Sequence, residues 1–279
     1  MNAREGFAEG EGSADNSFDA LAAAQMERLV SDLGRMYRER KEALEEVARA
    51  HHEALLRLAM AAEFKDGDTG VHIVRIGLLS EALALRMGVN ARTAAMLRCA
   101  APMHDVGKIG VPDKVLKKPG PLDAEERREM NLHAEMGAKI LGRSRIPLFQ
   151  LAADIALCHH ERFDGNGYPR GLAGEDIPLM ARIVSVVDFF DALTMDRVYR
   201  PAFSDEAALR MLLDQRGSAF DPRVVDAFMG HAAQLIALRD AINRERPGFD
   251  CLHQADAAVQ LFTPATADGF ALHMDGAQG

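Results

Sequence analysis

The chain has 279 residues, 48% of them hydrophobic and 27% charged, so it is long enough to bury a substantial core. Its net charge of −9 argues against broad, non-specific nucleic-acid binding, which needs a cationic surface, and its apolar runs are too short for a membrane span. The three cysteines have no paired spacing, which indicates a reducing compartment. We therefore expect a cytoplasmic globular protein that binds neither nucleic acid nor membrane.

The N-terminal part of the chain contains two predicted segments. Residues 1–18 are acidic and Gly-rich and lack the apolar stretch of a signal peptide, so we expect them to be disordered. Residues 19–62 lack proline and are rich in strong helix formers, which predicts one long helix.

Apolar positions along this helix alternate by four and three residues, and Arg40 alone interrupts the series. This spacing is typical of a coiled coil. It predicts a parallel homodimer through the helix; the alternative is an amphipathic helix packed on its own domain. The apolar positions are Ala22, Met26, Leu29, Leu33, Met36, Ala43, Val47, Ala50 and Ala54.

Residues 63–235 contain a succession of segments with helical apolar spacing, beginning with "TGVHIVRIGLLSEALALRMG". Several segments carry Asp, Ser or Pro near the start, where these residues favour helix initiation. The stretch "IVSVV" has the composition of a buried strand but lacks a plausible partner strand, so the predicted class is all-α. Residues 236–279 are expected to finish the last helix and end in an irregular tail.

Histidines and carboxylates recur through this helical region. Imidazole combined with carboxylate suits iron, manganese or a zinc-like ion, whereas magnesium and calcium prefer mostly oxygen ligands. His104 and Asp105 are neighbours, and on a helix their side chains would project about 100° apart and could flank an ion. Pro102 just before them would kink such a helix. The recurring residues are His72, His104, Asp105, His133, His159, His160 and Asp188.

The motif "HDVGK" followed by "HHERFDGNGYP" resembles the HD-GYP family of metal-dependent cyclic dinucleotide phosphodiesterases, and the match spans about residues 63–235. The resemblance implies an HD-superfamily helical bundle with two divalent metal ions, iron or manganese. It implies metal ligation by the seven residues above, with Asp105 as a bridge. It also implies hydrolysis of cyclic di-GMP to pGpG or GMP by a metal-bridging hydroxide, in bacterial second-messenger signalling.

The same resemblance assigns further roles. Lys108 would supply a cation to the phosphate, and Tyr168 in the Gly- and Pro-containing loop would line the substrate site. Arg197 and Arg200 match family positions that contact guanine or phosphate, for which the planar guanidinium is suited. Asp191, one helical turn after Asp188, is expected to orient a ligand or a basic group.

One position departs from the family pattern. Many members carry a glutamate that recruits a third metal four residues before the first histidine, where this chain has Asp68. Asp68 is either a third-metal ligand or the N-cap of the following helix. The product therefore stays open between pGpG and GMP.

Two alternatives to cyclic di-GMP hydrolysis also stay open. One is another cyclic dinucleotide, such as cyclic GMP-AMP. The other is a weakly active binding module that recruits GGDEF-domain diguanylate cyclases.

Overall fold

A computed structural model of the chain describes residues 12–66, 70–142, 144–196 and 201–253, and the side chains of residues 21 onward within these ranges except Asp66. The chain divides into two units, Met1–His51 and His52–Gly279. Helix α1 (Gly12–Asp66) is longer at both ends than the predicted 19–62 helix. In the part of the chain that the structure describes, no helix combines the length and apolarity needed to cross a bilayer.

Within the first unit, α1 exposes its large apolar side chains. Met26, Leu29, Leu33 and Met36 are each more than half exposed. They occupy the alternating spacing noted in the sequence, so α1 carries an apolar stripe that the first unit itself leaves exposed.

Within the second unit, the end of α1 buries a different stripe. His52, Leu56, Ala59 and Glu63 are buried and follow one another at spacings of four, three and four. His52 precedes Ala54, the last apolar position of the exposed stripe, by two residues, which is a rotation of about 200° around a helix. The exposed coiled-coil stripe therefore ends near Ala54, where the buried stripe that begins at His52 packs against the core of the second unit.

The rest of the second unit is helical in the described residues, with two isolated bridges and no strand. This confirms the all-α prediction, and "IVSVV" lies in α7. The elements are α2 (Val71–Arg86), α3 (Ala91–Ala100), η1 (Ala101–Met103), η2 (Val106–Gly110), α4 (Asp113–Leu116), α5 (Ala124–Leu141), α6 (Pro147–Cys158), η3 (Gly174–Asp176), α7 (Leu179–Thr194), α8 (Asp205–Asp214), α9 (Pro222–Gly230), α10 (Ala232–Glu245) and η4 (Phe249–His253).

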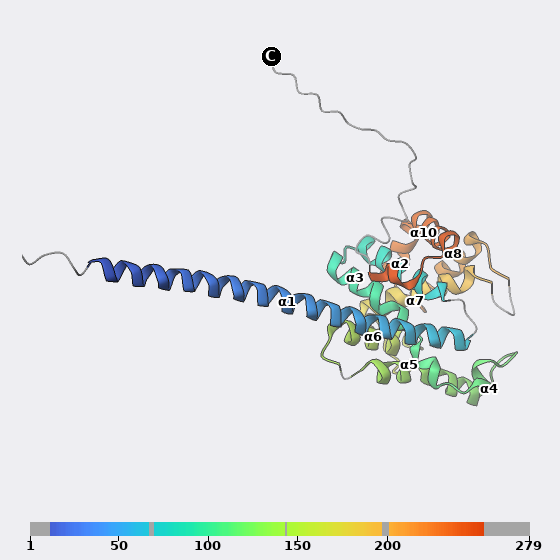
Figure 1. The fold of residues 1–279 in the computed structure, drawn as a ribbon. Helices are drawn as coiled ribbons and strands as arrows, with labels where there is room; N and C mark the ends of the chain where they lie inside the picture. The colour runs from blue at the N-terminus through green and yellow to red at the C-terminus, as the bar shows by residue number, and fades with distance from the viewer. Residues whose placement is uncertain (1–11, 67–69, 143, 197–200, 254–279) are drawn as a thin grey trace, which may run out of the picture. The chain divides into compact units, whose positions relative to one another are not determined.

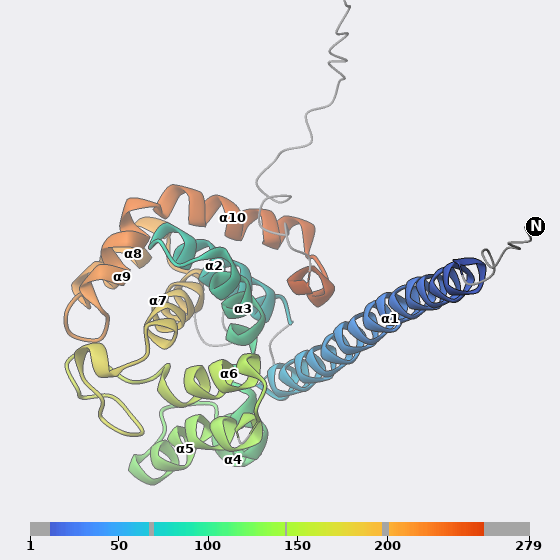
Figure 2. The same cartoon turned by 90° about the vertical axis from the view of Figure 1, so that its left-hand side faces the viewer.

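Helices α2 and α7 form the centre of the second unit (Figure 1). Figure 2 shows α2, α3 and α7 between α8, α9 and α10 on one side and α5 and α6 on the other. Helix α2 is buried over most of its length, with Ile73, Ile76 and Leu79 fully inside, as expected of a helix that is apolar all round. Polar side chains in so buried a helix need partners, and Glu81 has one in Arg98 at 2.8 Å.

The pair α5 and α6 packs closely against η2. Asp123 begins α5 with a capping box, in which its carboxylate and that of Glu126 each accept a backbone N–H. Gly107 in η2 lies so close to α5 that an added Cβ would stand 1.9 Å from the carbonyl oxygen of His133. The contact between η2 and α5 therefore requires glycine at this position.

Candidate metal centre

Seven side chains from several segments of the chain come together and form two groups. In each group, one ligand atom per residue lies within 4.8 Å of the others. Histidine and carboxylate together provide the N and O donors that suit a borderline divalent metal. The groups are Asp105, His133, His159 and His160, and His72, His104 and Asp188.

The local structure around His104 differs from the sequence prediction. Helix α3 ends at Ala100, and His104 and Asp105 lie in a turn between the 3₁₀ segments η1 and η2, not on a regular helix. Pro102 is in η1, where its missing N–H and fixed φ are tolerated. The kink expected at Pro102 is thus a full break in the α-helix, and it allows the side chains of two adjacent residues to approach each other, with His104 Nε2 3.4 Å from Asp105 Oδ2.

Four of the histidines are held by a hydrogen bond from Nδ1. A carbonyl or a carboxylate can only accept, so Nδ1 carries the proton in each and Nε2 is left as an acceptor. The pairs are His72 with Asp191 (2.7 Å), His104 with the carbonyl of Ala101 (3.0 Å), His133 with the carbonyl of Met130 (2.7 Å) and His159 with the carbonyl of Ala156 (3.0 Å).

The Nε2 atoms of His104, His133 and His159 and the Oδ1 atom of Asp105 are buried without a hydrogen-bond partner among the described residues. His133 Nε2 is 3.3 Å and His159 Nε2 3.5 Å from Asp105 Oδ1. Buried acceptors that face one another are unfavourable unless a cation lies between them. The donor set therefore fits a bound divalent ion.

The charges of the site also fit a bound divalent metal ion. Burial lowers the pKa of His72, but the hydrogen bond to Asp191 and the charges of Glu63 and Asp188 outweigh it and raise this pKa to about 10. The surrounding carboxylates thus stabilise a positive charge at His72, which a metal ion can provide in place of the proton. Burial lowers the pKa of His133 to about 4, so this imidazole is neutral and can donate a lone pair at pH 7.

Lys108 lies next to the predicted bridging carboxylate. Its Nζ is 2.7 Å from Asp105 Oδ2, and the charges of Lys108 and His104 outweigh burial and hold the pKa of Asp105 well below its usual range. The backbone after Lys108 is fixed by Lys65 of α1, which donates to the carbonyls of Ile109 (2.9 Å) and Val111 (2.6 Å).

The loop after the histidine pair is anchored to it. The Tyr168 ring stacks on His160, with centroids 4.8 Å apart. Gly167 approaches the backbone so closely that a Cβ would stand 2.3 Å from the nitrogen of Arg162. The buried Glu161 carboxylate accepts the N–H groups of Arg170 (2.7 Å) and Leu172 (3.0 Å) and so closes the loop.

Sequence reasoning missed several residues around this centre. Arg75 binds both carboxylate oxygens of Asp191, at 2.6 and 2.9 Å, and neutralises the group that orients His72. Glu63 lines the same cleft, and burial raises its pKa. The sequence signal for Glu63 is its place on the buried stripe of α1, where a polar residue is unusual.

Three predicted site residues, Asp68, Arg197 and Arg200, lie outside the described residues. All the described ones except the buried His104 and Asp191 line one cleft of about 1740 Å³, Lys108, Tyr168 and Asp188 among them. This volume is ample for a ligand larger than a mononucleotide.

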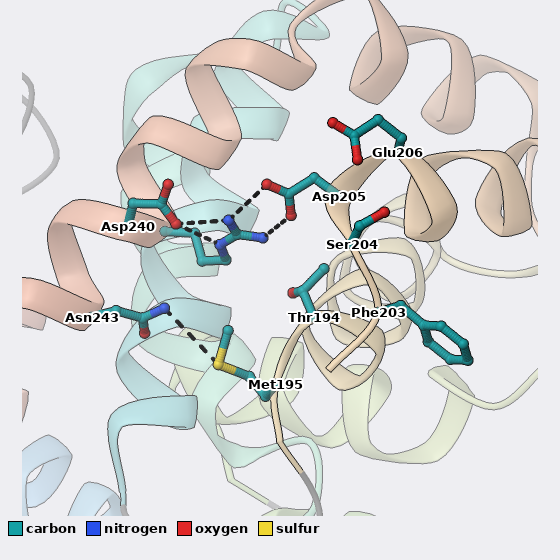
Figure 3. A pocket seen from close by; sticks show the side chains of 9 residues that line it. Thr194, Met195, Phe203, Ser204, Asp205, Glu206, Asp240 and Asn243 are labelled. Atoms are coloured by element: carbon teal, nitrogen blue, oxygen red, sulfur yellow. Dashed lines mark hydrogen bonds and ion pairs between the residues drawn. The ribbon is translucent and has the colours of Figure 1, made fainter. Parts of the chain in front are cut away.

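A second pocket of about 470 Å³ lies beside α8 and α10 (Figure 3). Its buried Arg239 binds Asp205 and Asp240, so these charges are mutually satisfied and join α8 to α10. Asn243 lines this pocket and the large cleft and accepts a hydrogen bond from Arg75 at 3.1 Å. We assign this pocket no chemistry.

Residues 42–224 match the model of a protein family described as HD domain. The chain belongs to the HD domain family. This confirms the fold and the family resemblance that the sequence predicted.

A crystal structure of a cyclic GMP-AMP-specific phosphodiesterase from Vibrio cholerae superposes with a TM-score of 0.52, covering 76% of this chain and 53% of that one. At 17% identity this similarity supports the fold alone.

Relatives of higher identity include the cyclic di-GMP phosphodiesterase response regulator RpfG of Xanthomonas campestris pv. campestris, which is 46% identical over 69% of this chain and 51% of its own length. The cyclic di-GMP phosphodiesterase of Thermotoga maritima is 45% identical over 63% of this chain and 48% of its own. The 3'3'-cGAMP-specific phosphodiesterase 2 of Vibrio cholerae is 42% identical over 68% of this chain and 36% of its own. This HD-domain chain spans about half, or less, of the length of these relatives.

Proposed function

We propose that this chain is a metal-dependent phosphodiesterase that hydrolyses cyclic di-GMP to pGpG, GMP or both, in bacterial second-messenger signalling. One observation carries the proposal. Three buried Nε2 atoms, of His104, His133 and His159, lie within 3.5 Å of the Asp105 carboxylate, and neither they nor Asp105 Oδ1 has a hydrogen-bond partner among the described residues. The similarity to curated cyclic di-GMP phosphodiesterases supports the choice of substrate.

We infer a centre of two divalent ions, iron or manganese, with Asp105 shared between the two groups of ligands. When bound, such ions neutralise phosphate oxygens and lower the pKa of a bound water toward about 7. The chain itself holds the ligand nitrogens in place through the Nδ1 hydrogen bonds and keeps His133 neutral by burial. Asp68 is the proposed ligand of a third ion. Its alternative role as the N-cap of α2 is wrong, because Gly70 occupies that position.

Lys108 and Tyr168 are the proposed substrate contacts among the described residues. Lys108 provides a cation beside Asp105 for the oxygens of the cleaved phosphate. Tyr168 presents an aromatic face at the wall of the cleft, suited to a purine base. Arg197 and Arg200 are proposed to contact guanine or phosphate by bidentate hydrogen bonds.

The test is product chromatography after incubation of anaerobically purified, iron- or manganese-loaded protein with cyclic di-GMP. We expect wild type to form pGpG or GMP and Asp105→Ala to lose at least about a thousandfold in rate, as expected when a metal centre is disrupted. Asp226→Ala, which removes an exposed carboxylate paired with Arg216, is the matched control and should keep wild-type activity. Equal rates for wild type and Asp105→Ala would refute the proposal.

A second candidate substrate is cyclic GMP-AMP. The 42% identity to a relative named as specific for 3'3'-cGAMP favours testing it. Competition between cyclic di-GMP and 3'3'-cGAMP in one reaction directly gives the ratio of kcat/KM for cyclic di-GMP to kcat/KM for 3'3'-cGAMP. A ratio below one assigns cyclic GMP-AMP as the substrate.

A binding module that recruits GGDEF-domain proteins without catalysis is disfavoured, because the seven proposed ligands and Lys108 are all present.

We also propose that α1 pairs with the α1 helix of a second copy. The exposed stripe that includes Met26, Leu29 and Leu33 supports this, since apolar side chains at heptad spacing are buried when two such helices associate. The free thiols of Cys99, Cys158 and Cys251 support a reducing, cytoplasmic location.

A further inference from the structure

One side of α5 carries a row of residues that line the large cleft at steps of three. They are Arg127, Met130 and His133, and His133 belongs to a metal-binding group. Residues three apart lie on neighbouring positions of a helix surface. Six residues span about 9 Å along the helix axis, so Arg127 stands well away from the metal centre but on the same wall.

Most cations of this cleft are already neutralised. Eight lysines and arginines line it in the part of the chain that the structure describes, and six of them form an ion pair with a carboxylate. The pairs are Lys65 and Lys117 with Asp113, Arg75 with Asp191, Lys108 with Asp105, Lys118 with Glu126, and Arg162 with Asp164.

Arg127 is one of the two that lack such a carboxylate among the described residues; the other is Arg246, the C-cap of α10. The acid next to Arg127 is engaged elsewhere, because Glu126 binds Lys118 and the N–H of Asp123. Arg127 also lines the same cleft as Tyr168, the proposed base-stacking residue.

Arg127 is exposed and has no carboxylate partner among the described residues, so its guanidinium, about 9 Å along the helix from a metal ligand, is available to a second anionic group of a ligand. A cyclic dinucleotide has two phosphodiesters, of which only one can occupy the metal centre at a time. Arg246 is less suited, since its helix α10 bears no metal ligand.

We propose that Arg127 binds the phosphate that is not being cleaved and thereby selects cyclic dinucleotides over simple phosphodiesters. The inference rests on the proposed function, since it assigns one end of that substrate. The guanidinium donates two hydrogen bonds to the phosphate oxygens while Tyr168 contacts the base between the two phosphates. Arg127 is a specificity residue and takes no part in bond cleavage.

The experiment compares Arg127→Gln with Arg128→Gln on two substrates, using full-length metal-loaded protein. Arg128 is the adjacent residue, is exposed, pairs with Glu125 and is absent from the cleft lining, so it is a matched control. The substrates are cyclic di-GMP and bis(p-nitrophenyl) phosphate, which has one phosphodiester. For Arg127→Gln we expect kcat/KM on cyclic di-GMP to fall by about 10- to 100-fold, mainly through KM, and on the simple diester to change less than about twofold. Arg127→Lys should recover part of the loss.

Two results would overturn the inference alone. One is equal kinetics of Arg127→Gln and Arg128→Gln on cyclic di-GMP. The other is an equal loss on both substrates, which would place Arg127 in the support of the metal centre. If wild type cleaves the simple diester but no cyclic dinucleotide, the proposed function fails and this inference fails with it.

Discussion

At the residue scale, the orientation of each imidazole depends on the acceptor that holds its Nδ1. Three of the four acceptors are backbone carbonyls of the helical segment that bears the histidine or precedes it, so local geometry supplies them. His72 is the exception, because its acceptor is the Asp191 carboxylate of another helix. A carboxylate also makes the imidazole a stronger donor to metal.

Asp191→Asn should therefore weaken metal binding. The amide can still accept from His72 but carries no charge, and Arg75 loses its ion pair. We expect metal affinity to fall about 10- to 100-fold, measured by competition with a chelator of known affinity. Asp221→Asn is the control, since Asp221 is also buried and paired with an arginine, Arg182, but binds no proposed metal ligand. Equal metal affinity for the two variants would contradict the role of Asp191.

Stability should depend on pH through His52, which is 5% exposed. Burial and the nearby His253 and Arg98 lower its pKa to about 4, although the hydrogen bond to the Cys99 carbonyl raises it. The unfolded chain, with a pKa near 6.5, binds this proton more readily, so stability is full above about pH 6.5 and falls as the pH drops toward 4. The shift corresponds to roughly 3 kcal/mol.

Urea unfolding at pH 7 and pH 4.5 measures this effect. His52→Gln should be less stable than wild type at pH 7 but lose less stability between the two pH values. His51→Gln changes an exposed neighbour and should keep the wild-type dependence. If His52→Gln and wild type lose the same free energy of unfolding, another group is responsible.

At the element scale, the position of η2 against α5 sets the place of Asp105 and Lys108. Gly107 makes this contact, since its Cβ position would be 1.9 Å from the carbonyl oxygen of His133 and 2.4 Å from the nitrogen of Gly137. Both are backbone atoms and cannot rotate away. Lys65 holds the other side of η2 through its carbonyls, so η2 is fixed from α1 and α5 together.

Gly107→Ala should force η2 away from α5. We expect a loss of about 3 kcal/mol or more in the free energy of unfolding and a parallel loss of bound metal. Gly230→Ala is the matched control, because Gly230 is helical and an added Cβ meets nothing within 4 Å. It should be neutral or stabilising by up to about 1 kcal/mol. Denaturant melts and metal analysis of the two variants would separate these outcomes, and a stable, metal-replete Gly107→Ala would contradict the packing argument.

At the scale of the whole molecule, local periodicity predicted the helices because the spacing of apolar residues in each helix reflects the face that the helix buries. The order of HDVGK, the histidine pair and the Tyr168 loop predicted the family. Contacts between distant segments could not be predicted in this way. Arg75 and Asp191 are 116 residues apart, and Glu63 enters the cleft only because α1 changes its buried face near His52. The break between η1 and η2 was also missed, since Pro102 predicts a kink but not its extent.

The proposed dimer rests on the two stripes of α1. The stripe from His52 to Glu63 is buried within the second unit, whereas Met26, Leu29, Leu33 and Met36 at the heptad positions before it are exposed. An exposed heptad seam favours pairing with a second identical helix, and Arg40 within the seam weakens that pairing.

We expect a dimer in sedimentation equilibrium at micromolar concentration. Leu33→Glu places a charge on the seam and should shift the protein to monomer. Leu21→Glu is the matched control, since Leu21 is similarly exposed but faces away from the seam. A wild-type monomer, or a dimer that survives Leu33→Glu, would show that α1 does not hold two copies together.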